Sequence, residues 1–335
     1  MSQDYRVDCC PNHLAAGRRR QVQIIDCTIR DGGLLNNWEF DHGLVQKTFR
    51  ALTEVGVDIM EVGYRSNDKV FDPDKYGPWR FCREDDLAKV AESSAMKLST
   101  MVDVGKVETS DIPHARDTLI DVVRIATYAH QLEDCQRIID HCLDSEYEVF
   151  VNLMAVSAIS EEAMDTFLQA MADSPVRNFT LVDSFGALYP YHVRYLMIKY
   201  RDLLGDMAVG IHAHNSQQNA FANSIEAINM GADYCDATVH GIGRGAGNTQ
   251  LELLLFYLSN PRYRIEPLLG LIEDYAALRD DLRWGYHLPY VITGYLNEHP
   301  RSAMALMRTE DRYKVLDFYH RLAGGKPGGW GGGAV

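Results

Sequence analysis

Two histidines separated by a single residue offer the clearest chemistry in the sequence. His212 and His214 lie in "GIHAHNS", at the end of an apolar run. Residues at positions i and i+2 of a β-strand point to the same side, so both imidazoles can bind one ion. Asp31 ends a second such run in "IIDCTIRDGG", and Asn248 lies in the glycine-rich segment "HGIGRGAGN". Two imidazoles, a carboxylate and an amide oxygen predict a divalent metal site.

The nitrogen ligands favour Mn²⁺ as the cofactor, with Co²⁺, Zn²⁺ and Mg²⁺ as alternatives. Each of these features also has a purely structural interpretation. A His-x-His pair alone is more often a hydrogen-bonded pair at a strand end, Arg30 alone could form a salt bridge, and the glycine-rich segment could be a mobile loop. It is the combination of the features that favours a metal site.

The elements that must position these residues alternate between short β-rich runs and longer helical periods. Helical patterns such as residues 41–56 and 216–232 end at glycines, which suit helix C-termini. A doubly wound sheet would carry a glycine-rich phosphate turn after its first strand, where this chain has Arg-Asp-Gly-Gly. Eight units therefore predict an α/β fold, a (β/α)₈ TIM barrel. Its predicted strands are residues 22–27, 57–64, 96–104, 121–127, 148–155, 178–184, 207–214 and 233–239.

A barrel gathers the residues that follow each strand at its C-terminal face, because the βα loops converge there. We therefore expect Asp31 and the two histidines to flank the end of the eighth strand. Gly32-Gly33 are expected to let the chain turn away from a crowded site. Other strand ends supply a candidate substrate-binding set, for which hydrogen bonding at the barrel rim is an equal alternative: Glu61, Thr127, Asp183 and Ser184.

The bulk composition limits the classes of function. The chain has 335 residues, 46% of them apolar, and a net charge of -14. This acidic excess argues against nucleic acid as a partner, because binding to a phosphate backbone needs a basic face. There is no apolar N-terminal leader and no apolar span of about 18 residues, which predicts a cytoplasmic protein without membrane contact. Seven cysteines without C-x-x-C spacing indicate reduced thiols.

One large domain is predicted, with additions at both ends. The divisions are an N-terminal arm (1–21), a TIM-barrel catalytic domain (22–260), a helical C-terminal extension packed on the barrel (261–323) and a flexible glycine-rich tail (324–335). The helical extension offers a docking surface for a homo-oligomer, which is expected by analogy.

Three motifs together, "DCTIRDGG", "IHAHNS" and "GIGRGAGNTQLE", resemble those of the DRE-TIM metallolyase superfamily of HMGL-like TIM barrels. The resemblance covers residues 22–260 and is closest to 4-hydroxy-2-oxovalerate aldolase-like proteins. It implies that Asp31, His212 and His214 are metal ligands and that Asn248 is a ligand or supports one. It also implies that Arg30 stabilises the oxygen of an enolate, the charge that develops when a carbon–carbon bond beside a carbonyl breaks.

Tyr290, in "GYHLPYVITGY", resembles the region that supplies a tyrosine acid in these aldolases, although a packing tyrosine is the more common interpretation. The sequence departs from the aldolases after the Arg-Asp-Gly motif. A histidine there acts as their general base, whereas this chain continues Leu34-Leu35-Asn36-Asn37-Trp38. Proton transfer then falls to His130, His240 or metal-bound water. Asn36 and Asn37 are candidates for binding the hydroxyls of a longer, polyhydroxylated 2-oxo acid.

The leading hypothesis is a metal-dependent aldolase that cleaves or forms a 4-hydroxy-2-oxo acid through a pyruvate-type enolate. Its partners would be a small 2-oxo acid and an aldehyde, and the resemblance admits an aldehyde dehydrogenase partner that no residue specifies. One alternative is a Claisen-type synthase that joins an acyl-CoA to a 2-oxo acid. Another is an HMG-CoA lyase-like enzyme, disfavoured because the loop after the eighth strand lacks that family's cysteine. A non-catalytic metal-binding barrel is the alternative from another class.

Overall fold

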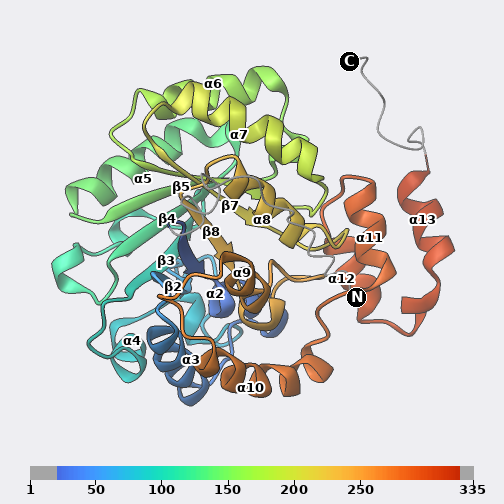
Figure 1. The fold of residues 1–335 in the computed structure, drawn as a ribbon, viewed down its shortest axis with the longest axis horizontal. Coiled ribbons are helices and arrows are strands. Elements are labelled where there is room, and N and C mark those ends of the chain that lie inside the picture. Colours follow the sequence, from blue (N-terminus) through green and yellow to red (C-terminus); the bar gives the residue numbers. More distant parts are fainter. Residues whose placement is uncertain (1–20, 325–335) are drawn as a thin grey trace, which may run out of the picture.

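The computed structural model describes residues 21–324. Eight parallel strands pair in chain order, and β8 returns to pair with β1, so the sheet closes into a barrel (Figure 1). The predicted TIM barrel is confirmed, and every observed strand lies within its predicted range. The strands are β1 (Gln23–Asp26), β2 (Ile59–Tyr64), β3 (Lys97–Asp103), β4 (Val122–Thr127), β5 (Glu148–Leu153), β6 (Asn178–Asp183), β7 (Ala208–Ala213) and β8 (Tyr234–Ala237).

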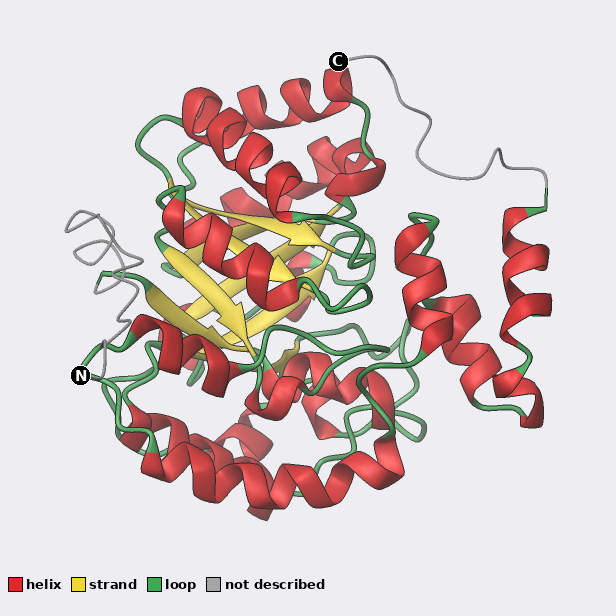
Figure 2. Ribbon diagram, turned by 45° about the vertical axis from the view of Figure 1, so that its right-hand side comes forward, coloured by secondary structure: helices red, strands yellow, loops and turns green. Residues whose placement is uncertain are grey.

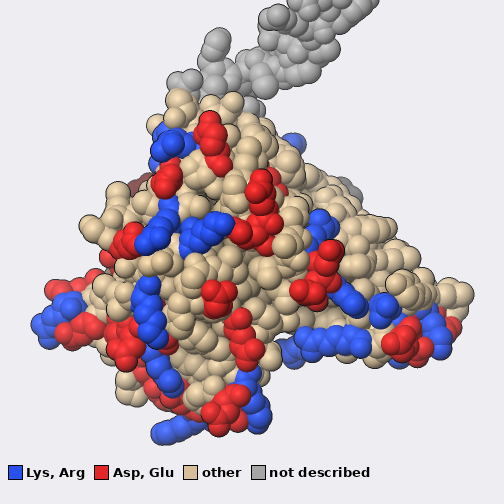
Figure 3. All heavy atoms as spheres, turned by 90° about the horizontal axis from the view of Figure 1, so that it is seen from below, with Lys and Arg blue, Asp and Glu red and all other residues tan. Residues whose placement is uncertain are grey.

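The predicted N-terminal arm up to residue 20, with its basic run 17–20, and the glycine-rich tail from residue 325 lie outside the described residues. Within residues 21–324, no helix combines the length and the apolar character needed to cross a bilayer. On the face shown in Figure 3, the basic side chains lie interspersed with acidic ones.

Helices cover the outside of the barrel (Figure 2), because their apolar faces pack on strands that are buried on both sides. The first of them shows clear end signals. The Asp41 side chain accepts a hydrogen bond from the Leu44 backbone N–H at its start, and Gly56 ends it at φ 91°. The covering helices are α3 (His42–Val55), α4 (Glu84–Val90), α5 (Leu132–Asp144), α6 (Glu161–Ala172), α7 (Pro190–Leu204) and α8 (Ala220–Asn229).

The segment after β1 differs from its prediction. Instead of turning away at Gly32-Gly33, the chain enters helix α2 (Thr28–Asn36), which contains both glycines. The glycines are needed for close packing rather than for a turn. A Cβ atom on Gly33 would lie 2.0 Å from the Trp38 ring, and one on Gly32 would lie 3.1 Å from Ile242. The helix therefore fits between the tryptophan and the loop that follows β8.

The C-terminal extension is helical, as predicted. It follows α9 (Leu251–Leu258) and contains α10 (Glu266–Leu282), α11 (Leu288–Tyr295), α12 (Arg301–Met307) and α13 (Val315–Ala323). Helix α10 packs against α3, and the buried Tyr275 hydroxyl lies 2.9 Å from the Thr48 hydroxyl. Helices α11 to α13 form a separate group at one side (Figure 1), with a small core of their own that includes Tyr290 and Phe318.

We predict that Tyr275→Phe lowers the free energy of unfolding by about 1 kcal/mol, because it removes one buried hydrogen bond and keeps the ring. Thr48 still donates to the Leu44 carbonyl in this variant. Urea unfolding followed by circular dichroism measures the change. Tyr286→Phe is the matched control, because Tyr286 is 61% exposed in the same extension. Equal stabilities of the two variants would contradict the role of this contact.

Candidate metal centre and active site

The ends of β7, β1 and β8 bring the predicted metal ligands together. The rings of His212 and His214 lie 4.9 Å apart, centre to centre. One ligand atom from each, together with a carboxylate oxygen of Asp31, lie within 4.8 Å of one another. Asn248 joins them because a backbone bridge pairs it with His214, and its side-chain amide donates to Asp31 at 2.6 Å. All four side chains are buried.

The hydrogen bonds of these residues leave acceptor atoms available for a cation. His212 and His214 use their Nδ1 atoms, toward the Asp236 carboxylate at 2.9 Å and the Asp183 carbonyl at 3.1 Å. Their Nε2 atoms are therefore the acceptors, and that of His214 lies 3.4 Å from the Arg244 guanidinium. His212 Nε2 and Asn248 Oδ1 are buried without a hydrogen-bond partner among the described residues. Unpaired buried acceptors are costly, so this set fits a divalent cation well.

The carboxylate in this set is kept ionised. Burial by itself raises the pKa of Asp31, but the Arg30 guanidinium, followed by His214, holds that pKa well below its usual range. Burial, followed by the nearby Arg244, lowers the pKa of His214 to about 4. Both groups are therefore in the protonation states that metal ligands need near neutral pH.

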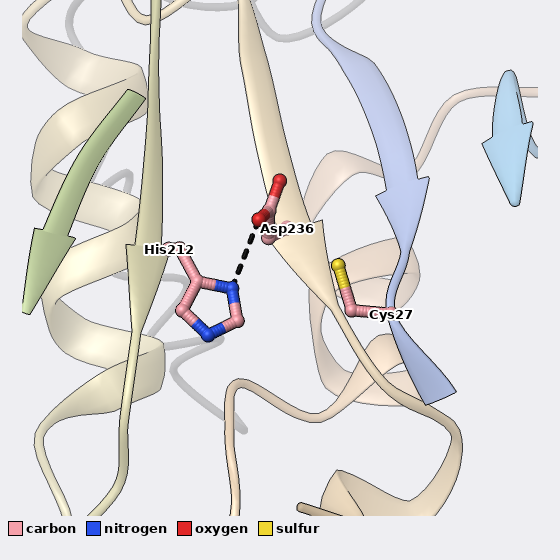
Figure 4. Close-up of side chains that lie close together, drawn as sticks. All are labelled: Cys27, His212 and Asp236. Atoms are coloured by element: carbon pink, nitrogen blue, oxygen red, sulfur yellow. Dashed lines mark hydrogen bonds and ion pairs between the residues drawn. The ribbon is translucent and has the colours of Figure 1, made fainter. Parts of the chain in front are cut away.

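Asp236 fixes the orientation of His212 from inside the barrel (Figure 4). The same carboxylate accepts a hydrogen bond from the fully buried Arg124 at 2.7 Å. Burial opposes its ionisation, but Arg124 and His212 lower the pKa of Asp236 to about 2. Cys27 lies beside this pair, and burial raises the pKa of its thiol well above the usual value. We interpret this group as support for His212 rather than as a second metal site.

Arg30 lies in the first turn of α2 and lines the cavity next to the metal ligands. Its Nε donates to Glu61 at 2.6 Å and its Nη1 to Asp31 at 2.7 Å. Its backbone carbonyl accepts from the Trp38 indole at 2.8 Å. Glu61 also lies 3.3 Å from Arg124, so one carboxylate holds two buried arginines. Glu61 was predicted to bind substrate or to form hydrogen bonds at the barrel rim, and in the structure it orients Arg30.

Asp183 and Ser184 shape the loop after β6. The Asp183 carboxylate accepts from the backbone N–H groups of Ala187 and Leu188, at 3.0 and 3.2 Å. Burial raises its pKa to about 7, against these hydrogen bonds. Ser184 lines the cavity, and its hydroxyl accepts from the Ala155 N–H at 2.8 Å. Asp183 thus acts on the site through its carbonyl, which holds His214.

Several predicted site residues are not part of the cavity lining in the described chain. His130 is exposed and stacks on Tyr128, which takes its place in the cavity. Tyr290 packs over Gly245 and belongs to the core of the helical extension. Asn36 and Asn37 lie at the far end of α2, because the chain continues as a helix past Asp31. The geometry therefore gives none of them contact with a bound substrate.

Thr127 and His240 also lie outside the lining of this cavity. Thr127 is fully buried, and its hydroxyl donates to the Tyr128 carbonyl at 3.2 Å. His240 lies in the loop after β8, with its backbone N–H on Glu252 and its ring against Trp284. Both residues support loops around the site.

The lining residues that sequence reasoning did not single out include Leu34, Arg244 and His299. Leu34 follows the Arg-Asp-Gly motif, in the region where the aldolases carry the histidine that acts as their general base. Arg244 lies inside the glycine-rich motif, so its place in the sequence could have predicted that it lies at the site. His299 comes from the helical extension, and no local pattern marks it. Burial, followed by Arg244, lowers the pKa of His299 to about 3, so its ring is neutral at pH 7.

A family model and individual proteins of known name are both similar to this chain. A family model described as HMGL-like matches residues 21–266. A 4-hydroxy-2-oxovalerate aldolase of Pelotomaculum thermopropionicum is 28% identical over 297 residues, which are 88% of this chain and 87% of that protein. An oxaloacetate decarboxylase of Mycobacterium tuberculosis is 27% identical over 272 residues, or 80% of this chain and 79% of that protein.

Solved structures show the same fold. The N-terminal domain of a candidate aldolase from Bacteroides vulgatus has a TM-score of 0.76 at 29% identity, covering 89% of this chain and 97% of that domain. An HMG-CoA lyase from Brucella melitensis has a TM-score of 0.65 at 16% identity, and the match covers 78% of this chain and 100% of that chain. The second likeness concerns the fold alone.

We predict that Asp236→Asn weakens divalent metal binding by about tenfold to a hundredfold, because it loosens the tautomer and orientation of His212. Isothermal titration of the metal-stripped protein with Mn²⁺ measures the affinity. Asp206→Asn, an exposed position before β7, removes the same charge as a control. A variant that keeps its fold and binds Mn²⁺ as tightly as this control would show that Asp236 does not support the ligand.

Proposed function

The chain belongs to the HMGL-like family, as the resemblance predicted, and on that premise we propose that it is a divalent-metal-dependent aldolase. It would cleave or form a 4-hydroxy-2-oxo acid, with pyruvate or a close relative as the enolate partner. The names of two similar proteins, 4-hydroxy-2-oxovalerate aldolase and oxaloacetate decarboxylase, support a reaction at the carbon beside a 2-oxo acid carbonyl.

One observation carries this proposal: unpaired buried acceptors for a cation lie in and beside the cavity that the buried Arg30 guanidinium lines. His212 Nε2 and Asn248 Oδ1 have no partner in the described chain, and Arg30 lies beside the ligand Asp31. A bound divalent ion would supply Lewis-acid polarisation of the 2-oxo acid. Mn²⁺ remains our first choice, because imidazole nitrogens supply half of the predicted ligands.

The contribution of the chain itself is a fixed positive charge where the enolate forms. When the C3–C4 bond of the substrate breaks, its electron pair passes to the enolate, the C4 hydroxyl would give its proton to a water molecule acting as the base, and an aldehyde leaves. Arg30 faces this developing charge. Its contacts with Glu61 and Asp31 hold the guanidinium in place before substrate binds, so little reorganisation accompanies the reaction.

The apolar part of the cavity serves the same chemistry by excluding water from the enolate. Leu34, Met101, Met154 and Val182 contribute to its lining. The cavity is small, about 70 Å³, which suits a small acid better than the long acyl-CoA arm that a Claisen-type synthase must accept. Release of free CoA from acyl-CoA and a 2-oxo acid would nevertheless identify the synthase or HMG-CoA lyase alternative.

Decarboxylation of a 2-oxo dicarboxylate is a second candidate, because it passes through the same enolate with CO₂ as the leaving group. The likeness to an oxaloacetate decarboxylase and the additional cation Arg244 in the cavity favour it over the CoA reactions. The homo-oligomer, the cytoplasmic location and the aldehyde dehydrogenase partner stay predictions of the sequence.

We predict that the wild-type protein with Mg²⁺ exchanges the methyl protons of pyruvate in D₂O, which proton NMR follows as loss of the methyl signal. Asp31→Asn should abolish the exchange. Arg30→Met should slow it by about a hundredfold or more, because it removes a preorganised charge that faces the enolate. Arg83→Met, at an exposed salt bridge with Asp68, is the matched control and should exchange at the wild-type rate.

Absence of exchange with Mg²⁺, Zn²⁺ and Co²⁺ in the wild-type protein would refute a pyruvate enolate. Exchange that persists in Asp31→Asn would refute the proposed metal ligand.

A further inference from the structure

Arg244 is a half-buried cation of the cavity, and its guanidinium pairs with no carboxylate among the described residues. The other arginines of the barrel mouth and interior are paired: Arg30 with Asp31 and Glu61, and Arg124 with Asp236 and Glu61. Within residues 21–324, no acidic side chain forms a salt bridge with Arg244. Its side-chain contacts are the Ser184 carbonyl, His214 Nε2 at 3.4 Å and His299 Nε2 at 3.2 Å, while its backbone N–H donates to the Asp31 carboxylate at 3.4 Å. Its Nε is buried without a partner in the described chain.

The contact between Arg244 and His299 brings two hydrogen-bond donors together. The Arg301 backbone N–H, which can only donate, lies 3.1 Å from His299 Nδ1. Nδ1 must therefore accept, and the neutral ring carries its proton on Nε2. That N–H faces Arg244 Nη1, which is also a donor. Two donors that converge beside a cavity are poorly satisfied by each other, and the oxygen atoms of an anion would satisfy both.

The charge balance of the site indicates where this anion belongs. A divalent ion with Asp31 leaves one positive charge, which the carboxylate of a bound 2-oxo acid neutralises. Arg30 with Glu61 and Arg124 with Asp236 are two neutral pairs beside it. Arg244 is then the one positive charge of the cavity lining left without a counter-charge in the described chain. A substrate with a second acidic group would supply that charge, and the half-buried position of Arg244 would make the pairing stronger than one on an open surface.

We propose that Arg244 and His299 form a subsite for a second carboxylate, so that the preferred substrate is a dianionic 2-oxo acid. This inference rests on the proposed function, which places the 2-oxo acid group on the metal. Arg244 supplies the charge and a planar pair of donors, and His299 supplies a neutral N–H from the helical extension. The two residues are specificity residues, since neither is required to stabilise the enolate.

The experiment compares two acids with the same carbon chain, 2-oxoglutarate and 2-oxopentanoate, which differ only in a terminal carboxylate or methyl group. Isothermal titration measures their dissociation constants with the full-length protein and Mg²⁺. The wild-type protein should bind 2-oxoglutarate about tenfold to a hundredfold more tightly, the range of a charge-assisted hydrogen-bonded pair. Arg244→Met should remove this preference and leave the affinity for 2-oxopentanoate within about twofold.

Two further variants keep the test decisive if Arg244→Met does not fold. Arg244→Lys should retain part of the preference, because it keeps the charge and loses the planar donor pair. His299→Leu should reduce the preference by removing one donor. Arg83→Met is the matched control for net charge and should keep the full preference, because Arg83 lies on the surface with Asp68.

Equal binding of the two acids by the wild-type protein would overturn the subsite. So would an Arg244→Met variant that loses affinity for both acids equally, because Arg244 would then contact the end that they share. Failure of both acids to bind, in a protein that exchanges pyruvate protons, overturns the subsite and leaves the proposed function intact. Failure of both binding and exchange overturns the two proposals together.

Discussion

A chain of buried polar contacts inside the barrel, formed by His212 and five charged side chains, connects the two sides of the metal site. It runs from His212 to Asp236, then through Arg124 and Glu61 to Arg30 and Asp31, with polar contacts of 2.6 to 3.3 Å between neighbours. Strands β7, β8, β4 and β2 and helix α2 supply its members. Each charge is buried, so none can lose its partner without a large desolvation cost. This constraint fixes the position of both the cation ligands and Arg30.

Such a chain contributes geometry more than stability, because the desolvation of buried ions offsets most of their attraction. The stability of the fold comes from apolar burial on either side of it. A small apolar cluster inside the barrel includes Ile25, Phe150 and Tyr234, and Tyr234 lies two residues before Asp236 on β8. A much larger core lies between the strands and the outer helices. The charges are thus held in a rigid frame, which is what an electrostatically preorganised site requires.

The segments around this frame supply the residues that shape the cavity. Helix α2 places Leu34 in the cavity, and the packing of Trp38 on Gly33 holds that helix in position. The loop after β8 contributes Arg244, and the extension contributes His299. These residues line the cavity and lie outside the charged chain. Variation in the loops over a constant interior is how a barrel changes substrate while it keeps its chemistry.

The sequence by itself determined the barrel and the ligand set, because both depend on local patterns. Strand and helix periods are repeated along the chain, and His212-x-His214 is placed on one side of β7 by strand geometry alone. Only the tertiary structure decided which other side chains meet them. His130 and Asn36 follow strands yet lie away from the cavity, whereas His299 comes from the loop between α11 and α12. Arg124, in an ordinary strand pattern, became the centre of the interior when the sheet closed. Closure of the sheet into a barrel brings together residues that are far apart in sequence, and a local sequence pattern cannot predict those contacts.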